Sequence, residues 1–203
     1  MVDWRQETVD TYNKSAKELA DYFRGIGSRV EDVEEAFRLA GNPNSANALE
    51  IGCGDGRDAK EIIKRTPNYT GFDISSELIK LAQKHVPNAR FEVADLANYA
   101  FPQDLDIVFA FASLLHSDKT EVKNVLAKVY QALNIGGIFY ISLKYMPEYT
   151  NRIKEDKYGR RKFYFYNPQL MLELAGENFE VVFGDSQTMG HTDWFTIAFQ
   201  KKV

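Results

Sequence analysis

The stretch Ala48-Leu49-Glu50-Ile51-Gly52-Cys53-Gly54-Asp55-Gly56 decides the fold of this chain. An apolar run here ends in an acidic residue and three alternating glycines, and a second apolar run, Tyr69–Phe72, ends in the carboxylate of Asp73. Glycines allow the backbone to approach a ligand closely, and a helix that starts near Gly56 directs free N–H groups to the same place. A carboxylate at the tip of the next parallel strand can accept hydrogen bonds from both hydroxyls of a ribose. The pattern therefore predicts a cofactor that contains a nucleoside.

The spacing of the glycines narrows the class of nucleoside-containing cofactor that this site can bind. The dinucleotide fingerprint G-x-G-x-x-G has a third glycine where this chain has Arg57. The residues after Gly54 are Asp-Gly-Arg-Asp, so the lysine of a phosphate-binding P-loop is missing as well. These departures argue against both a dinucleotide and a nucleoside triphosphate.

The spacing E-x-G-x-G-x-G, with an aspartate that ends the next strand, resembles the class I S-adenosylmethionine-dependent methyltransferases of the small-molecule type. Three later segments, Phe91–Leu96, Asp104–Phe111 and Leu133–Ile141, extend the resemblance in the order and spacing of that family. The family's lysine-proline pair before the fifth strand is Asn134-Ile135 here. The resemblance runs from about Tyr12 to Ile141, and it implies S-adenosyl-L-methionine as the cofactor and S-adenosyl-L-homocysteine as its product.

The resemblance also implies where the cofactor is held. It places Asp95 at the adenine, and it gives Glu50 the role of supporting the glycine loop or the methionine amino group. Asp73 is expected at the ribose, with a simple loop cap as the alternative. Arg57 either pairs with Asp58 on the surface or meets the cofactor carboxylate. The residues expected to bind the cofactor are Glu50, Gly52, Cys53, Gly54, Asp55, Gly56, Arg57, Asp73, Ile74, Asp95, Leu96, Phe111 and Ala112.

Composition is typical of one enzyme-sized domain. The chain has 203 residues, 44% of them hydrophobic, which is enough to bury a full core. No apolar stretch approaches the roughly 20 residues that span a bilayer, and the stretch Met1–Glu7 shows no secretion segment. The single cysteine, Cys53, indicates a reducing cytoplasm and a packing role. The net charge of −4 argues against a broad nucleic-acid surface. We expect a monomer or homodimer.

Strands and helices alternate along the chain. Strands are expected at 47–51, 69–73, 89–94, 105–111, 137–143, 181–183 and 195–199. Helices are expected at 4–24, 29–40, 57–66, from Ser75 or Ser76 to His85, at 119–132, and from Asn167-Pro168 to about Gly176. This order predicts an α/β fold with a doubly wound, mostly parallel sheet. The resemblance implies seven strands, the last of them antiparallel at 194–200.

We expect one methyltransferase domain over residues 1–203. It comprises an N-terminal helical cap (1–45), a cofactor-binding core (46–143), an acceptor lid (144–166) and a C-terminal part with a helix and strands (167–203).

Two residues are candidates for the chemistry itself. His116 follows the fourth strand, in a stretch that by resemblance borders the methyl donor, and an imidazole there can act as a general base near neutral pH. The alternative is a histidine that caps or packs under the next helix. Tyr12 heads a Tyr-x-x-x-Ala helix that resembles the pocket-covering helix of small-molecule members, and it is expected at the sulfonium or the acceptor, or else in helix packing. The three histidines show no metal-ligand spacing, so no metal site is expected.

The segment 144–166 interleaves basic and aromatic residues after the fifth strand. Lys144, Tyr145, Arg160 and Arg161 are the candidates for binding an acceptor that carries a carboxylate or phosphate. The alternation in Lys162–Tyr166 equally predicts a hairpin with one charged face and one aromatic face. Single-stranded nucleic acid is a further alternative for such a segment. The Asn/Asp-Pro-Pro-Tyr segment that base methylases carry after the fourth strand is missing, which argues against that alternative.

Three functions remain open from the sequence. The first is a cytoplasmic methyltransferase that acts on an O or N atom of a small molecule, anionic or aromatic. The second is a protein or RNA methyltransferase. The third is a cofactor-binding protein of the same fold that has lost the transfer activity, since a fold does not by itself establish a reaction.

Overall fold

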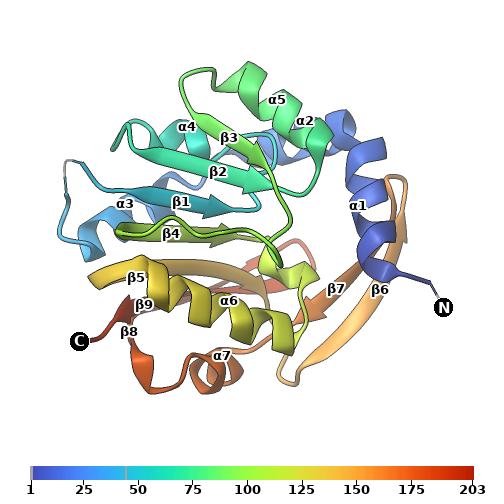
Figure 1. Ribbon diagram of the computed structural model, residues 1–203. Helices are drawn as coiled ribbons and strands as arrows, with labels where there is room; N and C mark the ends of the chain where they lie inside the picture. The colour runs from blue at the N-terminus through green and yellow to red at the C-terminus, as the bar shows by residue number, and fades with distance from the viewer. Residues whose placement is uncertain (1, 44) are drawn as a thin grey trace.

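The computed structural model describes residues 2–43 and 45–203, so that Met1 and Asn44, two residues of the expected helical cap, lie outside the described residues. Within this part of the chain one sheet has seven strands in the order β3-β2-β1-β4-β5-β9-β8 (Figure 1). β1 to β5 pair in parallel, whereas β9 runs antiparallel to both β5 and β8. The strands are β1 (Ala48–Ile51), β2 (Tyr69–Asp73), β3 (Arg90–Val93), β4 (Leu105–Phe111), β5 (Leu133–Lys144), β8 (Phe179–Met189) and β9 (Thr192–Lys201).

Helices cover both faces of the sheet, and each face has its own apolar core. On one face lie α3 (Val30–Leu39), α4 (Ala59–Ile62) and α5 (Ser76–His85), whose buried side chains include Phe37 and Ile62. On the other face lie α6 (Lys119–Ala132) and α7 (Pro168–Ala175), with Leu126 and Met171 buried against the sheet. This three-layer arrangement confirms the predicted doubly wound fold with its antiparallel final strand.

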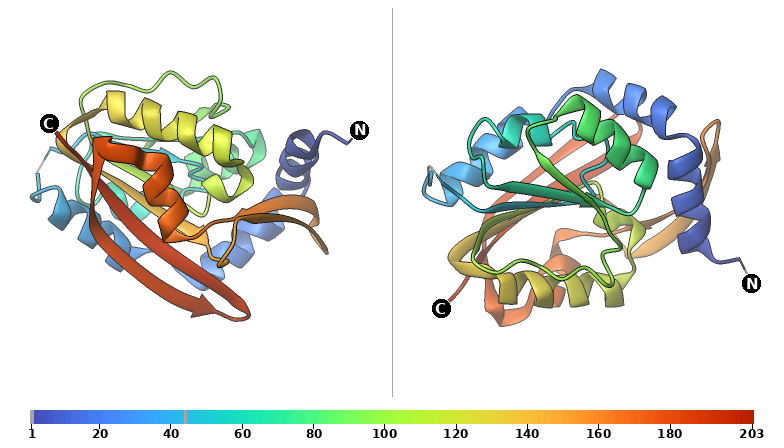
Figure 2. Two further views of the ribbon diagram at one scale, coloured as in Figure 1. Left: turned by 90° about the horizontal axis from the view of Figure 1, so that it is seen from below. Right: turned by 45° about the horizontal axis from the view of Figure 1, so that its top comes forward.

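A cover of helices and a hairpin, separate from these three layers, lies over the carboxyl ends of the parallel strands. It consists of α1 (Trp4–Lys14), α2 (Ala16–Ile26) and a separate two-stranded hairpin of β6 (Thr150–Asp156) and β7 (Gly159–Phe165). α1 lies along this hairpin (Figure 2). Three hydrogen bonds join them: Thr11 Oγ1 to Arg160 O at 2.8 Å, Ser15 Oγ to Tyr158 O at 2.7 Å, and Lys162 N to Thr8 Oγ1 at 3.2 Å. The two segments therefore form one joint cover.

Side-chain caps fix several of the helix starts. Ser75 caps α5 through its hydroxyl, and Asn167 caps α7 with Pro168 in the first turn. Asp118 and Glu121 form a reciprocal capping box on α6. Two short 3₁₀ helices, η1 (Leu114–His116) and η2 (Gly176–Asn178), complete the described elements.

The sequence predicted most elements but misplaced several boundaries. The helix expected at 4–24 is two helices that meet at Ser15, which has φ −110° and ends the first. The helix expected at 57–66 is regular only over Ala59–Ile62. β5 begins at Leu133, four residues before the expected 137, and the final strands are longer than expected because they continue into a hairpin.

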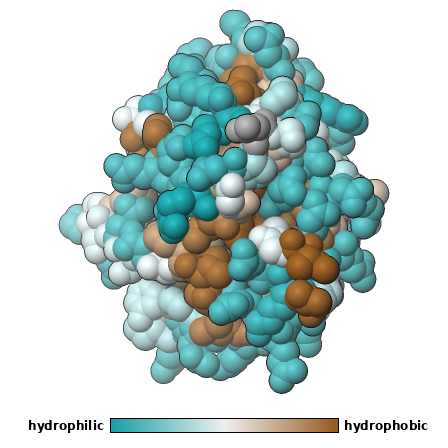
Figure 3. Space-filling model, turned by 90° about the vertical axis from the view of Figure 1, so that its left-hand side faces the viewer, coloured by the Kyte–Doolittle hydropathy of each residue, from teal (hydrophilic) through white to brown (hydrophobic). Residues whose placement is uncertain are grey.

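The end of the molecule that carries the starts of the parallel strands and the C-terminus shows apolar patches among mostly hydrophilic side chains (Figures 1 and 3). Ile135, which is 66% exposed near the start of β5, is one of the exposed apolar residues of the chain. None of the helices in the described ranges is long and apolar enough to cross a membrane.

Candidate functional site

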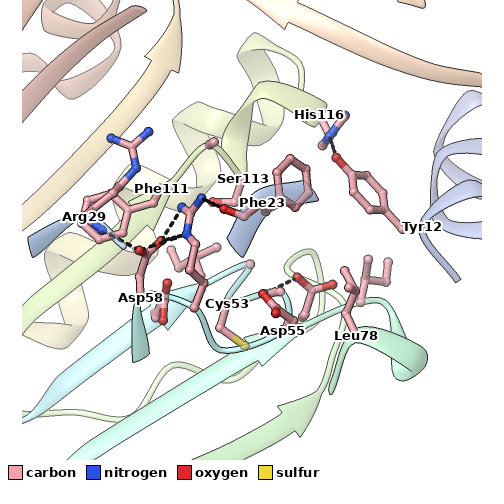
Figure 4. Close-up of a pocket in the computed structure, with 18 of the residues that line it drawn as sticks. Tyr12, Phe23, Arg29, Cys53, Asp55, Asp58, Leu78, Phe111, Ser113 and His116 are labelled. Carbon is pink, nitrogen blue, oxygen red and sulfur yellow. Dashed lines mark hydrogen bonds and ion pairs between the residues drawn. The ribbon is translucent and has the colours of Figure 1, made fainter. Parts of the chain in front are cut away.

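A cavity of about 880 Å³ opens at the carboxyl ends of the parallel strands. Its floor is the glycine loop after β1, and its walls come from the ends of β2 and β4, from η1 and from the loop before α3. Trp4, Arg5, Thr8 and Tyr12 of α1 line it from above, and the β8–β9 hairpin adds Gln187, Met189 and Trp194. Ligands of open α/β sheets bind at this edge. Figure 4 shows part of the lining.

The glycine loop can follow its path because of Gly52. Its φ is +70°, and a Cβ there would lie 2.4 Å from the Cβ of Ser113. The loop after β4 therefore packs directly against the loop after β1, and Ala112 also takes a positive φ of 52°. Such a backbone in a non-glycine residue is strained and is often found at functional sites.

Asp73 lies at the end of β2 and is fixed by backbone donors of two loops. Its Oδ2 accepts from Gly54 N at 3.0 Å and its Oδ1 accepts from Ser75 N at 2.8 Å. Burial raises the pKa of Asp73, and the backbone N–H donors oppose that rise. Asp73 lines the cavity beside Ile74, so the carboxylate and the glycine loop meet as the sequence predicted.

Glu50 is buried at the back of the same floor. The Tyr69 hydroxyl donates to Glu50 Oε2 at 2.5 Å. Burial raises the pKa of Glu50 to about 8; Asp58 adds to the rise, whereas the Tyr69 hydrogen bond opposes it. Cys53, next in the loop, has its thiol pKa raised well above the usual value by burial, which agrees with a packing role.

Arg57 and Asp58 form an ion pair, but the pair is not on the surface. Arg57 Nη2 lies 2.6 Å from Asp58 Oδ2, and Asp58 is 4% exposed. Asp58 also accepts from Arg29 N at 2.9 Å, which ties the loop before α3 to the glycine loop (Figure 4). Arg29 in turn pairs with Asp32 at 3.0 Å and stacks over the ring of Phe111. This network forms one end of the cavity.

Asp55 and Asp95, both expected to bind the cofactor, form ion pairs with other side chains of the protein. Asp55 is 4% exposed and lies 3.3 Å from Arg24 Nε and 3.5 Å from His85 Nδ1, although it also lines the cavity. The Asp95 carboxylate is bound to Arg5 and to Ala97 N. Its neighbours Ala94 and Leu96 line the cavity, and the Asp95 side chain itself does not. The expectation that Asp95 reaches the adenine is not supported by this position.

Tyr12 and His116 both line the cavity and contact each other there. The Tyr12 hydroxyl lies 2.9 Å from His116 Nε2 (Figure 4). On the other side of the ring, His116 Nδ1 lies 2.7 Å from the carbonyl oxygen of Lys162. A carbonyl can only accept, so Nδ1 carries the proton and Nε2 accepts from Tyr12. Burial, together with Arg161 and Lys144, lowers the pKa of His116 to about 4. This low pKa and the hydrogen bond at Nε2 argue against His116 as a general base near neutral pH and agree with the alternative of a packed histidine.

The four residues expected to bind the acceptor do not line the cavity. Arg161 is 5% exposed and binds Asp156 at 2.6 Å, and Arg160 lies within 4.0 Å of both Glu7 and Glu155. Lys144 lies 3.8 Å from the centre of the Phe163 ring, and burial lowers its pKa to about 8. Tyr145 faces a separate shallow pocket beside α7. Their hairpin reaches the cavity through Lys162 and Tyr164 instead.

The sequence reasoning missed the contributions of two other segments. Asp185, Gln187 and Met189 line the cavity from β8 at every second position, the period of one face of a strand. This alternation was visible in the sequence, but the expected strand stopped at 183. Arg29 carried no comparable signal, because its place depends on the fold of the loop before α3. Among the described residues no group of three His, Cys, Asp or Glu side chains is arranged to hold a metal ion.

Comparisons with known proteins agree with this geometry. A family model described as a methyltransferase domain matches residues 48–137, which hold the glycine loop, Asp73 and β4. Trans-aconitate 2-methyltransferase of Variovorax paradoxus is 29% identical over 126 residues, 60% of this chain and 48% of that protein. Malonyl-[acyl-carrier protein] O-methyltransferase 1 of Ilyobacter polytropus is 26% identical over 211 residues, 98% of this chain and 76% of that protein. The chain thus spans about half the length of the first relative.

A solved structure shows the same fold over nearly the whole chain. It is the 1,6-didemethyltoxoflavin-N1-methyltransferase of Burkholderia thailandensis with bound 1,6-didemethyltoxoflavin and S-adenosylhomocysteine. The TM-score is 0.72 at 18% identity, and the match covers 99% of this chain and 90% of that one.

Proposed function

We propose that this chain is a class I S-adenosylmethionine-dependent methyltransferase that transfers a methyl group from S-adenosylmethionine to an oxygen or nitrogen atom of a small-molecule acceptor. The observation that carries the proposal is the pairing of Asp73 with the glycine loop on the floor of one deep cavity. The sulfonium of the bound cofactor supplies an electrophilic methyl group. The protein has to orient the two reactants and exclude water.

Residues of the floor account for cofactor binding in this proposal. Asp73 accepts from the two ribose hydroxyls, and Glu50 faces the α-ammonium group. Arg57 binds the cofactor carboxylate: its Nη1 lies 3.5 Å from Phe23 O, at the limit of a hydrogen bond, and is available for a stronger acceptor.

Tyr12 is the proposed contact to the acceptor, and His116 acts through it. Because His116 Nε2 holds the Tyr12 proton, the remaining lone pair of the phenol oxygen can accept a hydrogen bond from the acceptor's hydroxyl or amine. Burial raises the pKa of Tyr12, so the phenol stays neutral and works as an orienting group. His116 is therefore a positioning residue in this proposal.

The dimensions of the cavity favour a small acceptor over a protein or RNA. Its volume of about 880 Å³ falls within the roughly 300–1,000 Å³ typical of small-molecule sites, and the cofactor occupies part of it. α1 and the β6–β7 hairpin, joined by hydrogen bonds, cover the place where a macromolecular substrate would enter. Lys162, Tyr164 and Trp194 form the acceptor wall in this proposal.

The test is a transfer assay with methyl-labelled S-adenosylmethionine. Separate pools of small carboxylic acids (with trans-aconitate among them), hydroxyaromatics and amines are incubated with the protein, and products are identified by mass spectrometry. A labelled product should form with the wild type, and at limiting cofactor concentration it should form at least several-fold more slowly in Asp73→Ala. If S-adenosylhomocysteine binds but no pool becomes labelled, the small-molecule acceptor proposed here is contradicted, and a macromolecular acceptor or a cofactor-binding protein without transfer activity takes its place.

A further inference from the structure

Resting on the proposed function, we infer that Tyr69 is a positioning residue for cofactor binding, which holds the Glu50 carboxylate where the α-ammonium group of the cofactor meets it. Gly71 is the residue that makes this contact possible. Neither residue belongs to the glycine loop, and neither lines the cavity.

The register of the sheet explains how Tyr69 reaches Glu50. β1 and β2 are parallel neighbours in which Ala48 pairs with Tyr69 and Glu50 pairs with Gly71. Tyr69 and Gly71 are two residues apart, so their side-chain positions share one face of β2. The Tyr69 side chain extends along that face, past position 71, and its hydroxyl donates to Glu50 Oε2 at 2.5 Å.

Gly71 is required for space at this point and not for backbone conformation, since its φ is not in the left-handed region. A Cβ at position 71 would lie 2.3 Å from the Tyr69 hydroxyl and 2.8 Å from the Cβ of Cys53. Any larger residue at position 71 therefore has to push Tyr69 away from Glu50 or displace the glycine loop.

The contact between Tyr69 and Glu50 is buried in the protein. Tyr69 is 3% exposed and Glu50 is 2% exposed, and the Tyr69 ring packs edge-to-face on Phe91 at 5.9 Å. A hydroxyl that donates to one carboxylate oxygen leaves the other oxygen for a ligand, and it fixes the rotation of the carboxylate. Glu50 lines the cavity, so the ligand side of the carboxylate is the cofactor side.

The charges around Glu50 show why its carboxylate benefits from the hydrogen bond of Tyr69. Asp58 and Asp73 disfavour the Glu50 carboxylate, Arg57 favours it, and burial disfavours it most. The Tyr69 hydroxyl favours the ionised form by hydrogen bonding to it, and a cationic ammonium needs that form as its partner.

Two ligands separate this role from general support of the fold. S-adenosylhomocysteine carries the α-ammonium group, whereas 5′-methylthioadenosine has the same adenosine and sulfur without the amino acid. Calorimetry at pH 7.5 should show that Tyr69→Phe lowers the affinity for S-adenosylhomocysteine about tenfold or more, because one charge-assisted hydrogen bond is lost. The affinity for 5′-methylthioadenosine should stay within twofold of the wild type. Gly71→Ala should weaken the binding of S-adenosylhomocysteine at least as much, because the added Cβ meets both the Tyr69 hydroxyl and Cys53 of the glycine loop.

Tyr166→Phe is the matched control. It removes an equally buried hydroxyl, which donates to Ser117 O at 2.6 Å, and both affinities should stay at the wild-type values. In a Glu50→Gln background, Tyr69→Phe should cause no further selective loss.

Two outcomes would overturn the inference. One is S-adenosylhomocysteine affinity within twofold of the wild type in a folded Tyr69→Phe or Gly71→Ala protein. The other is an equal loss for both ligands in Tyr69→Phe, which would give Tyr69 a structural role only. If the wild type binds neither ligand, the proposed function itself fails. That result differs from the two outcomes that would overturn the role of Tyr69.

Discussion

At the scale of single residues, the hydrogen bonds of His116 favour a positioning role over general-base chemistry. One ring nitrogen is fixed as a donor by Lys162 O, so the other must accept from Tyr12. The nearby cations Arg161 and Lys144, together with burial, disfavour the imidazolium, and the pKa of His116 is about 4. A proton from the acceptor therefore has no favourable resting place on this ring at neutral pH.

This arrangement predicts the kinetics of the pair. Tyr12→Phe should lower kcat/KM for methyl transfer about 10- to 100-fold, because one orienting hydrogen bond in a dry site is lost. His116→Gln should have a smaller effect, since its amide oxygen can still accept from Tyr12. The wild-type rate should show no ionisation of His116 between pH 5 and pH 8, because its pKa is about 4.

The control for these variants is Tyr22→Phe, which changes a tyrosine that is 54% exposed on α2 and should leave the kinetics unchanged. A rate that rises through one ionisation near pH 6.5, and loses that step in His116→Gln, would contradict this account and would restore His116 as a general base.

At the scale of elements, the sequence predicted the boundaries of those strands and helices whose ends depend on nearby residues. β2, β4 and α6 have the predicted ends, because apolar periodicity and strong caps define them. The alternation around Lys162–Tyr166 predicted a hairpin, and β6 pairs with β7. The pocket contacts of this hairpin depend instead on how it docks on α1. The sequence pattern therefore indicated Arg160 and Arg161 for the acceptor, whereas Lys162 and Tyr164 are the residues that line the cavity.

The docking of the hairpin on α1 can be tested at Gly159. Its φ is +129°, and a Cβ there would lie 2.8 Å from Thr11 Oγ1. Gly159→Ala should separate the hairpin from α1 and raise amide hydrogen exchange in residues 4–14 and 150–165 at least several-fold. It should also weaken acceptor binding, because Lys162 and Tyr164 lose their place on the cavity wall.

Gly184→Ala is the control for that experiment, because a Cβ at position 184 meets no atom within 4 Å. Unchanged exchange in residues 4–14 of the Gly159→Ala protein would show that α1 is held in place without the hairpin.

At the scale of the whole molecule, the sequence predicted the floor of the site better than its cover. Glu50, the glycine loop and Asp73 lie within one strand-turn-helix unit and its neighbour, where a linear motif fixes the geometry. Arg29, Trp194 and the hairpin residues come from distant segments, whose arrangement requires the finished tertiary structure.

The buried carboxyl groups of that floor affect the stability of the whole fold. The pKa of Glu50 rises from 4.5 to about 8 on folding, so the folded protein holds an extra proton between these values. Stability of the cofactor-free protein should therefore fall as pH rises through this window. The slope from one group approaches about 1.4 kcal/mol per pH unit. His116 opposes this trend below about pH 6.5, where the unfolded chain takes up its proton.

Denaturant unfolding between pH 6.5 and pH 7.5 isolates the contribution of Glu50. The wild type should lose stability over this interval, and Glu50→Gln should lose less by about 1 kcal/mol. Parallel pH dependences in the two proteins would mean that Glu50 is already ionised in the empty site.

The most direct measurement for the central claim is calorimetric titration of the wild type and Asp73→Ala with S-adenosylhomocysteine and with NAD. We expect the wild type to bind S-adenosylhomocysteine and to bind NAD weakly or not at all. Asp73→Ala should lower the affinity for S-adenosylhomocysteine tenfold or more, because two hydrogen bonds to a charged acceptor are worth roughly 1.5–3 kcal/mol each. The exposed-carboxylate control Glu173→Ala should bind as the wild type does. Wild-type affinity in a folded Asp73→Ala protein, or tighter binding of NAD, would contradict the account.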